Sequence, residues 1–159
     1  MTWAVQPDAW QRQMLRRFAG ARRFAFNACC RHNTRLLSSN IPKEKRRALF
    51  TPFDNINWWN KWKRSPEALE GDSGKKGFDW VDEVPQEIFE EGAVDFGRAM
   101  TAWGKYRKTM KAYRALPPSN KKGKKPRTVG FPGFRSKNDL KQSYRLRQKS
   151  GRPRFVLRT

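Results

Sequence analysis

The residues of this chain that could support acid–base or metal chemistry are its carboxylates, one histidine and two cysteines. Ten of the 14 acidic residues lie between residues 67 and 95, and only Asp139 follows Asp95. Cleavage of a phosphodiester by two metal ions requires several carboxylates that converge in one pocket. A solvated loop and the dipole of a helix start explain the acidic segment without a metal. The sequence therefore predicts no catalytic residue, and we expect this chain alone not to be an enzyme.

His32 lies close to Cys29 and Cys30 in the sequence, and these residue types can bind zinc. A structural zinc site usually takes four ligands from two separated pairs, and the sequence has no second pair. Adjacent cysteines on a helix point about 100° apart and cannot join in a disulfide without distortion. We therefore expect no metal site and no cofactor in this chain, and the unpaired cysteines favour a reducing compartment.

Cations are the most abundant reactive groups of the chain. The 159 residues include 36 Lys and Arg against 14 Asp and Glu, for a net charge of +22. A chain this basic is expected to bind a polyanion. A membrane surface is one candidate, but we find neither an apolar run of about 18 residues nor a short charged-then-apolar leader. The composition favours nucleic acid as the partner, with no membrane partner and a cytoplasmic location.

The first element that could position these cations is a helix of about eight turns that starts after Asp8. Asp8 can cap this helix, and Gln11 can reach back to complete a capping box. Apolar residues recur at steps of three or four, which is the period of one buried helical face. They are Trp10, Met14, Phe18, Ala21, Ala25 and Cys29. The other faces carry Arg12, Arg16, Arg17, Arg22, Arg23, Arg31 and Arg35. This pattern predicts a face that follows phosphates, and an ordinary solvated helix is the alternative.

Three tryptophans, Trp58, Trp59 and Trp62, form a cluster in the second element, between residues 40 and 66. This segment also contains prolines suited to helix starts. Helical spacing places Trp58 and Trp62 on one face with Trp59 beside them, so at least one ring should be partly exposed. Most such tryptophans belong to a core, and stacking on a nucleic-acid base is the alternative.

A second long helix is expected from Pro85 to about Ala115. Its first turns are acidic and its last turns are basic, which matches the helix dipole. Its apolar stripe consists of Phe89, Ala93, Phe96, Met100, Trp103 and Met110. Gly92, Gly97 and Gly104 each weaken a helix by about 1 kcal/mol relative to Ala, so another element should approach closely there. Short β-capable pieces follow at 128–131, 143–147 and 154–159.

Three separated motifs resemble the N-terminal, OrfB-type helix-turn-helix half of the transposon-encoded TnpB proteins, which are relatives of the type V CRISPR effectors. The first motif is "QPDAWQRQMLRRFAGARRFAFN", with Pro7, Gln11, Gly20, Arg23 and Asn27 at the family spacing. The second is "FDWVDEVP" before the long helix, and the third is "VGFPGFRSKNDLKQSYR". The resemblance covers nearly all of the chain and implies a role in RNA-guided DNA recognition linked to transposition.

The resemblance implies a mainly α fold with a minor β part, in which a helical recognition lobe is inserted in an incomplete wedge-like β-barrel. Residues 1–7 would be a remnant of the first barrel strand, and residues 8–116 would be the helical lobe. Residues 117–128 would be a basic linker, and residues 129–159 a wedge-like β segment. In the family a RuvC-like nuclease follows this region. We expect that half to be missing here, and Mg²⁺ to be needed only by it.

The resemblance also implies nucleic-acid contacts at particular residues. Arg23 and Asn27 match the family's R-x-x-x-N pattern on the first helix, with bracing of a neighbouring backbone as the alternative. The start of the long helix would face the DNA motif beside the target, where a carboxylate can accept from cytosine N4. In the third motif the phenylalanines Phe131 and Phe134 would pack inward while basic residues hold phosphates. The candidate set is Arg22, Arg23, Asn27, Phe53, Gln86, Glu87, Glu90, Arg135, Lys137, Ser143, Tyr144 and Arg145.

The expected function is therefore the nucleic-acid-binding portion of a TnpB-like RNA-guided DNA endonuclease that lacks its catalytic half. Its expected partners are a guide RNA, double-stranded target DNA and a separate nuclease chain. It would act in a prokaryotic cytoplasm, associated with the nucleoid when bound to DNA. One alternative is a binding-only regulator or one half of a split system. Another is a general basic RNA-binding protein without a guide.

Overall fold

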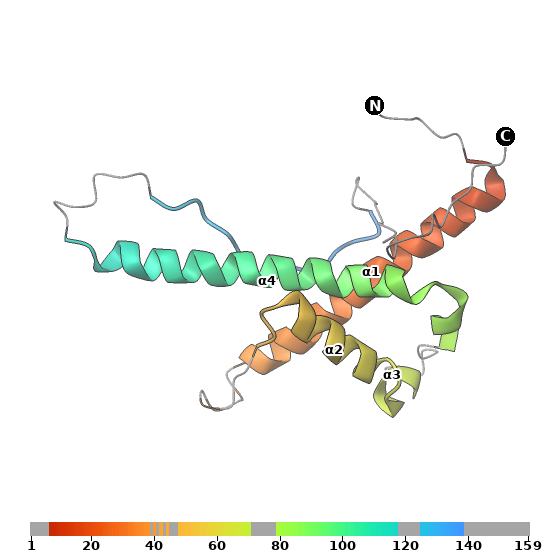
Figure 1. Ribbon diagram of the computed structural model, residues 1–159, viewed down its shortest axis with the longest axis horizontal. Coiled ribbons are helices and arrows are strands. Elements are labelled where there is room, and N and C mark those ends of the chain that lie inside the picture. Colours follow the sequence, from red (N-terminus) through yellow and green to blue (C-terminus); the bar gives the residue numbers. More distant parts are fainter. Residues whose placement is uncertain are drawn as a thin grey trace, which may run out of the picture.

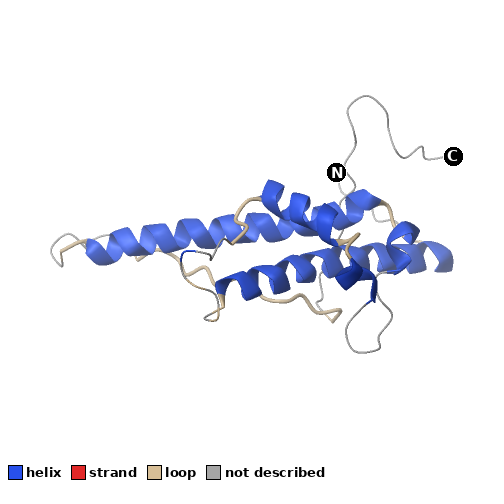
Figure 2. Cartoon of the chain, turned by 90° about the horizontal axis from the view of Figure 1, so that it is seen from below, coloured by secondary structure: helices blue, strands red, loops and turns tan. Residues whose placement is uncertain are grey.

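Helices make up the regular structure of the described part of this chain (Figure 1). The computed structural model describes residues 7–38, 40, 42, 44, 48–70, 79–117 and 125–138. Two long helices, α1 (Ala9–Leu37) and α4 (Gln86–Ala115), are connected through α2 (Pro52–Trp62), α3 (Pro66–Glu70) and the 3₁₀ helix η2 (Asp79–Glu83). Figure 2 shows no strand in the described residues. The expectation of a mainly α fold is confirmed.

The start of α1 is fixed by the capping box that the sequence predicts. The Asp8 carboxylate accepts from the backbone N–H of Gln11 at 2.7 Å, and the Asp8 N–H donates to the Gln11 side chain at 3.1 Å. The first turns of α1 precede its contact with α4, so Trp10 is 68% exposed. The expectation that Trp10 belongs to the buried face is wrong for this reason. Ala21, Ala25 and Cys29 are fully buried, as the spacing predicts.

The core forms where α1 crosses α4, and the two helices run in the same direction through the contact. Arg22 of α1 meets Gly92 of α4, and one turn later the Phe26 and Phe96 rings meet edge to face at 5.3 Å. A Cβ on Gly92 would lie 2.2 Å from the backbone oxygen of Arg22, so only glycine permits this approach. Gly97 likewise admits the backbone of Pro52, where a Cβ would lie 2.5 Å from Cα. The predicted close approaches at α4 glycines are confirmed.

Helix α2 completes the core with aromatic rings. Trp59 is fully buried between Phe24 of α1 and Phe89 of α4, with ring centroids 6.1 and 5.5 Å away. Trp58 and Trp62 are half-buried and stack on each other at 5.4 Å. The expected partly exposed ring in this cluster is confirmed. Pro52 begins α2 after its N-cap Thr51, as the proline suggests.

Two fully buried asparagines hold the chain between α1 and α2. Asn33 donates to Asn55 at 3.2 Å and accepts from the backbone N–H of Leu49 at 2.7 Å. Asn55 donates to the backbone oxygens of Leu49 and Thr51 at 2.9 and 2.8 Å. Buried amides are stable only when bonded in this way. The pair therefore fixes the short stretch from Leu49 to Thr51 against both helices.

Residues 125–138 form a loop that lies on α1 and α4. The β-capable piece at 128–131 is not in a strand. The loop is held to α1 further along, where Cys30 donates to the Pro132 backbone oxygen and Asn27 to that of Arg135. Phe131 packs edge to face on Trp103 at 5.1 Å, as predicted, but Phe134 is 60% exposed, so its inward packing is wrong. The segments 1–6, 143–147 and 154–159, which include most of the expected barrel, lie outside the described residues.

Candidate nucleic-acid interface

One side of α1 carries a row of arginines. Arg12, Arg16, Arg23 and Arg31 fall within an arc of about 100° on a helix of 3.6 residues per turn, with Gly20 between them. Arg12, Arg16 and Arg31 are exposed, and Arg23 is half-buried. We call these four residues the α1 arginine row. Guanidinium groups gathered on one side of a helix in this way suit the phosphates of a nucleic-acid backbone.

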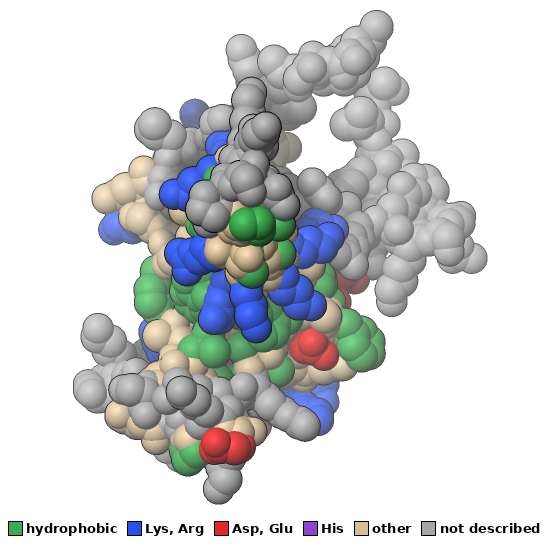
Figure 3. All heavy atoms as spheres, turned by 90° about the vertical axis from the view of Figure 1, so that its left-hand side faces the viewer, with side chains coloured by type: hydrophobic (Ala, Val, Ile, Leu, Met, Phe, Trp, Pro, Cys, Tyr) green, Lys and Arg blue, Asp and Glu red, His purple; other side chains and the backbone are tan. Residues whose placement is uncertain are grey.

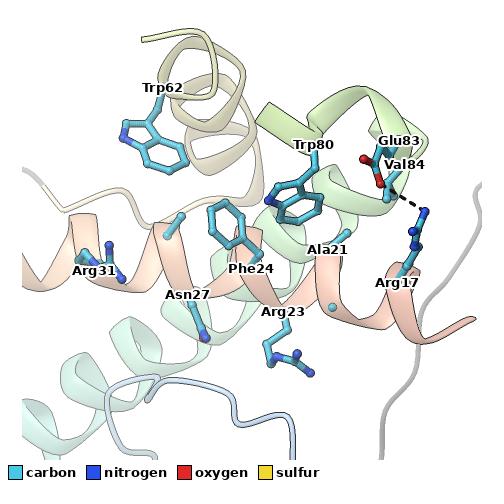
Figure 4. A pocket seen from close by; sticks show the side chains of 12 residues that line it. Arg17, Ala21, Arg23, Phe24, Asn27, Arg31, Trp62, Trp80, Glu83 and Val84 are labelled. Carbon is cyan, nitrogen blue, oxygen red and sulfur yellow. Dashed lines mark hydrogen bonds and ion pairs between the residues drawn. The ribbon is translucent and has the colours of Figure 1, made fainter. Parts of the chain in front are cut away.

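A pocket of about 510 Å³ opens beside the α1 arginine row (Figure 4). Its basic lining includes Arg17, Arg23 and Arg31 from α1. Its aromatic lining is Phe24 of α1, Trp62 of α2 and Trp80 of η2, and Figure 4 shows Phe24 between the two indoles. We call this cavity the arginine–tryptophan pocket.

The aromatic wall of this pocket is held by ring contacts and one ion pair. Phe24 meets Trp80 edge to face at 5.4 Å and lies 6.3 Å from Trp62. The guanidinium of Arg17 donates to the Glu83 carboxylate at 3.2 Å, which ties η2 to α1 at the rim. Exposed aromatic faces stack on bases and neighbouring arginines hold phosphates in single-strand binding sites. The pocket contains both kinds of group.

Asn27 does not point freely to solvent but clamps the loop 125–138. Its amide nitrogen donates to the backbone oxygen of Arg135 at 3.0 Å, and its amide oxygen accepts from the Arg135 N–H at 2.8 Å. Asn27 also lines the arginine–tryptophan pocket, as does Arg23. The alternative that Asn27 braces a neighbouring backbone is therefore the one that the geometry supports. The clamp brings two predicted site residues together although they are 108 positions apart.

Arg22 and Arg135 are tied to a common carboxylate inside the fold. The Asp95 side chain, 13% exposed, pairs with Arg22 and accepts from Arg135 at 3.3 Å. Arg22 is 9% exposed. The Arg135 guanidinium also lies over the Phe26 ring, 3.9 Å from its centroid. Arg22 faces α4 and pairs with Asp95, so the structure does not bring it to the surface with the other predicted site residues, and its contact with nucleic acid stays a prediction. Arg135 serves first as a tie between the loop and the helices.

The predicted DNA-facing residues at the start of α4 form a separate polar cluster. Gln86 donates to the Glu90 carboxylate at 2.6 Å, and Asn60 of α2 donates to the same oxygen at 3.3 Å. Burial lowers the pKa of the neighbouring Lys63, and the Glu90 carboxylate opposes that shift. Glu87 is half-buried on the same turn. None of these residues lines the arginine–tryptophan pocket.

The remaining predicted site residues are scattered. Phe53 is 71% exposed at the first turn of α2, and Lys137 is exposed at the end of the loop. Ser143, Tyr144 and Arg145 lie outside the described residues. The predictions for these five residues stay predictions. Trp80 was missed as a pocket residue, and its only signal in the sequence was its place within "FDWVDEVP".

The thiols of α1 lie in the interior, and its histidine is half-buried. Cys29 and Cys30 are buried and unpaired, as the sequence predicts, and burial raises the pKa of both thiols. His32 stacks on Trp58 at 4.3 Å, and burial lowers its pKa. Within the described residues, no three His, Cys, Asp or Glu side chains come together as they would around a metal ion. Nor does any helix in the described ranges have the length and apolar character to cross a membrane.

A scan against protein-family models, a search of the curated proteins and a search of the solved structures gave no match to this chain.

Proposed function

We propose that this chain is a nucleic-acid-binding unit whose main contact surface is the α1 arginine row with the arginine–tryptophan pocket. The observation that carries this proposal is that Arg23 and Arg31 line the same cavity as Trp62 and Trp80. The arginines would hold backbone phosphates, and the aromatic wall would take an unstacked base. The net charge of +22 supplies the long-range attraction.

The finer form of the proposal is the guide-RNA- and DNA-binding portion of a TnpB-like RNA-guided endonuclease. Its support is the motif resemblance together with the Asn27 clamp, which joins the first motif to the third through two hydrogen bonds to Arg135. The RuvC-like half and its Mg²⁺ would reside in another chain. This unit would work in a prokaryotic cytoplasm, and on the nucleoid when a guide and target DNA are bound.

The first test is to crosslink the chain in its native host, purify it under denaturing conditions and sequence the attached RNA. One enriched RNA that maps to the edge of the chain's own locus is expected. A spread of ribosomal and transfer RNA would instead show that only a general basic RNA-binding surface exists. No recovered nucleic acid at all would contradict the proposal in both forms.

The second test compares two double variants of equal charge. Arg16→Ala/Arg31→Ala removes two cations of the α1 arginine row, and Lys61→Ala/Arg64→Ala removes two exposed cations on and just after α2. The first variant should lower the log–log salt slope of RNA binding by about 1.4, because each neutralised phosphate of a single strand contributes about 0.7. The second should leave the slope nearly unchanged. Equal slopes for both variants would assign the binding to charge in general and not to this surface.

A further inference from the structure

The end of α4 projects beyond the helical crossing and carries its own set of cations. Figure 1 shows the last turns of α4 extending away from α1 and α2. Five exposed cations lie there, and no carboxylate of the described residues pairs with any of them. They are Lys105, Arg107, Lys108, Lys111 and Arg114. Figure 3 shows blue side chains gathered at this end of the molecule. The helix dipole favours cations here but does not require five of them.

Four of these cations share one side of the helix with a groove. Arg107, Lys108, Lys111 and Arg114 fall within an arc of about 120° around α4. All four line a groove of about 990 Å³, whose other lining residues include Phe50, Thr51, Thr101, Gly104 and Met110. We call this feature the α4 groove. A basic rim over an apolar floor distinguishes it from an ordinary solvated helix end.

Phe50 is held in the α4 groove as a fixed and partly open aromatic ring. Its ring lies parallel to Trp103, with an angle of 8° and a centroid distance of 6.2 Å, and it is 38% exposed. A Cβ on Gly104 would lie 3.2 Å from the Phe50 ring, so the absence of a side chain at this position leaves room for the ring. Thr101 donates to the Phe50 backbone oxygen at 2.8 Å.

The neighbours of Phe50 in the chain are also fixed. Buried Asn33 and Asn55 bond the backbone of Leu49, and Thr51 caps α2. The ring is therefore held in place before any ligand arrives, which removes part of the ordering cost of stacking. An exposed ring on a flexible loop would lack this support.

We propose that the α4 groove binds single-stranded nucleic acid, with the backbone along the four cations and one base stacked on Phe50. A positive groove that contains a partly exposed aromatic ring is typical of single-strand sites. The bases of a duplex stack on one another and leave no free face for an aromatic ring. A membrane-binding helix would need a broad exposed apolar face, but Met110 is only 6% exposed here. The inference rests on the proposed function, and it adds a second, separate contact surface.

The charge part of this proposal is tested by anisotropy with a labelled oligouridylate of about 12 nucleotides. Lys108→Ala/Lys111→Ala should weaken binding roughly tenfold and lower the salt slope by about 1.4. The control Lys61→Ala/Arg64→Ala removes the same charge elsewhere and should change affinity less than about twofold. Equal effects of the two variants would overturn the α4 groove as a site.

The stacking part is tested by Phe50→Leu, which keeps an apolar side chain against Gly104 and Trp103 but removes the ring face. Affinity should fall about tenfold with an unchanged salt slope, since no phosphate contact is lost. Phe134→Leu is the matched control, because that ring is 60% exposed but does not line the groove. An equal loss in the control would overturn the assignment of stacking to Phe50.

Further outcomes separate the explanations. A hairpin duplex that competes as well as oligouridylate would overturn single-strand binding. So would a result in which Lys108→Ala/Lys111→Ala weakens binding to anionic vesicles but not binding to oligouridylate. Oligothymidylate as competitor distinguishes DNA from RNA as the source of the strand.

The independence of the two surfaces is tested by a photo-crosslink of 4-thiouridine to the Phe50 peptide. Arg16→Ala/Arg31→Ala should leave this crosslink intact, and its loss would overturn that independence. A wild-type chain that binds no oligonucleotide would contradict the proposed function itself.

Discussion

Two groups of cations in this fold have opposite surroundings. At the crossing of α1 and α4, Asp95 pairs with Arg22 and Arg135 in a site that is mostly closed to solvent. On the α1 arginine row and at the end of α4, the cations are mainly exposed. The comparison shows that the position of Asp95 decides which arginines are drawn into the interior. Arg22 and Arg23 are neighbours in sequence, but a step of about 100° around the helix directs only Arg22 toward Asp95.

The largest effect is expected when the interior group is broken by Asp95→Asn. This change leaves the nearly buried Arg22 guanidinium without its carboxylate, and removal of one partner of a buried pair typically costs about 3–5 kcal/mol. The free energy of unfolding, measured with urea, should fall by about 3 kcal/mol. The loop 125–138 should also become more sensitive to proteases, because Arg135 loses the same partner.

Glu83→Gln is the matched control for that measurement. It breaks the Arg17–Glu83 pair, whose side chains are 50% and 56% exposed, and should cost less than about 1 kcal/mol. A loss for Asp95→Asn no larger than for Glu83→Gln would mean that the interior pairing contributes no more than a surface ion pair, and the comparison would fail.

Much of the fold could be predicted from sequence because the deciding interactions are local. The capping box of Asp8 and Gln11, the apolar period of both long helices and the start of α4 after Pro85 depend on residues a few positions apart. The glycines of α4 predicted close approaches correctly. Glycine weakens a helix, so its presence in α4 indicates that another element comes close there. These features need no knowledge of the partner element.

The candidate site was less predictable because its parts are distant in sequence. The role of Arg22 depends on Asp95, 73 positions away, and the role of Asn27 depends on a loop 108 positions away. Trp80 enters the arginine–tryptophan pocket only because η2 packs on α1. No local period carries information about such pairings, so the sequence could name arginines and tryptophans but could not divide them between core and surface.

A smaller effect on the free energy of unfolding is expected from His32, which is half-buried. Burial holds its pKa below the usual 6.5, with Glu67 opposing and Arg35 reinforcing the shift. The unfolded chain therefore binds a proton at a higher pH than the folded chain, so stability should fall as pH drops below about 6.5. The chain contains one histidine, so unfolding free energies between pH 7.5 and about 5.5 report largely on this residue.

His32→Phe provides the contrast, because its ring can keep the stacking on Trp58 but takes up no proton. The fall in stability across this pH window should be reduced in the variant. An unchanged pH profile would show that other groups cause it and that His32 is not held neutral by its surroundings.

The smallest expected effect comes from Gly20→Ala, and it separates stability from binding at the surface. A Cβ at Gly20 would meet only the Arg23 guanidinium, at 3.9 Å, so the fold does not need glycine there as it does at Gly92. The substitution should raise the free energy of unfolding by about 0.5–1 kcal/mol through helix propensity. If a nucleic-acid backbone approaches α1 closely between Arg16 and Arg23, RNA affinity should fall in the same variant. Gln13→Ala, an exposed change two turns earlier, should alter both quantities little. A gain in stability without a loss in affinity would remove Gly20 from the contact and confine binding to the arginine side chains.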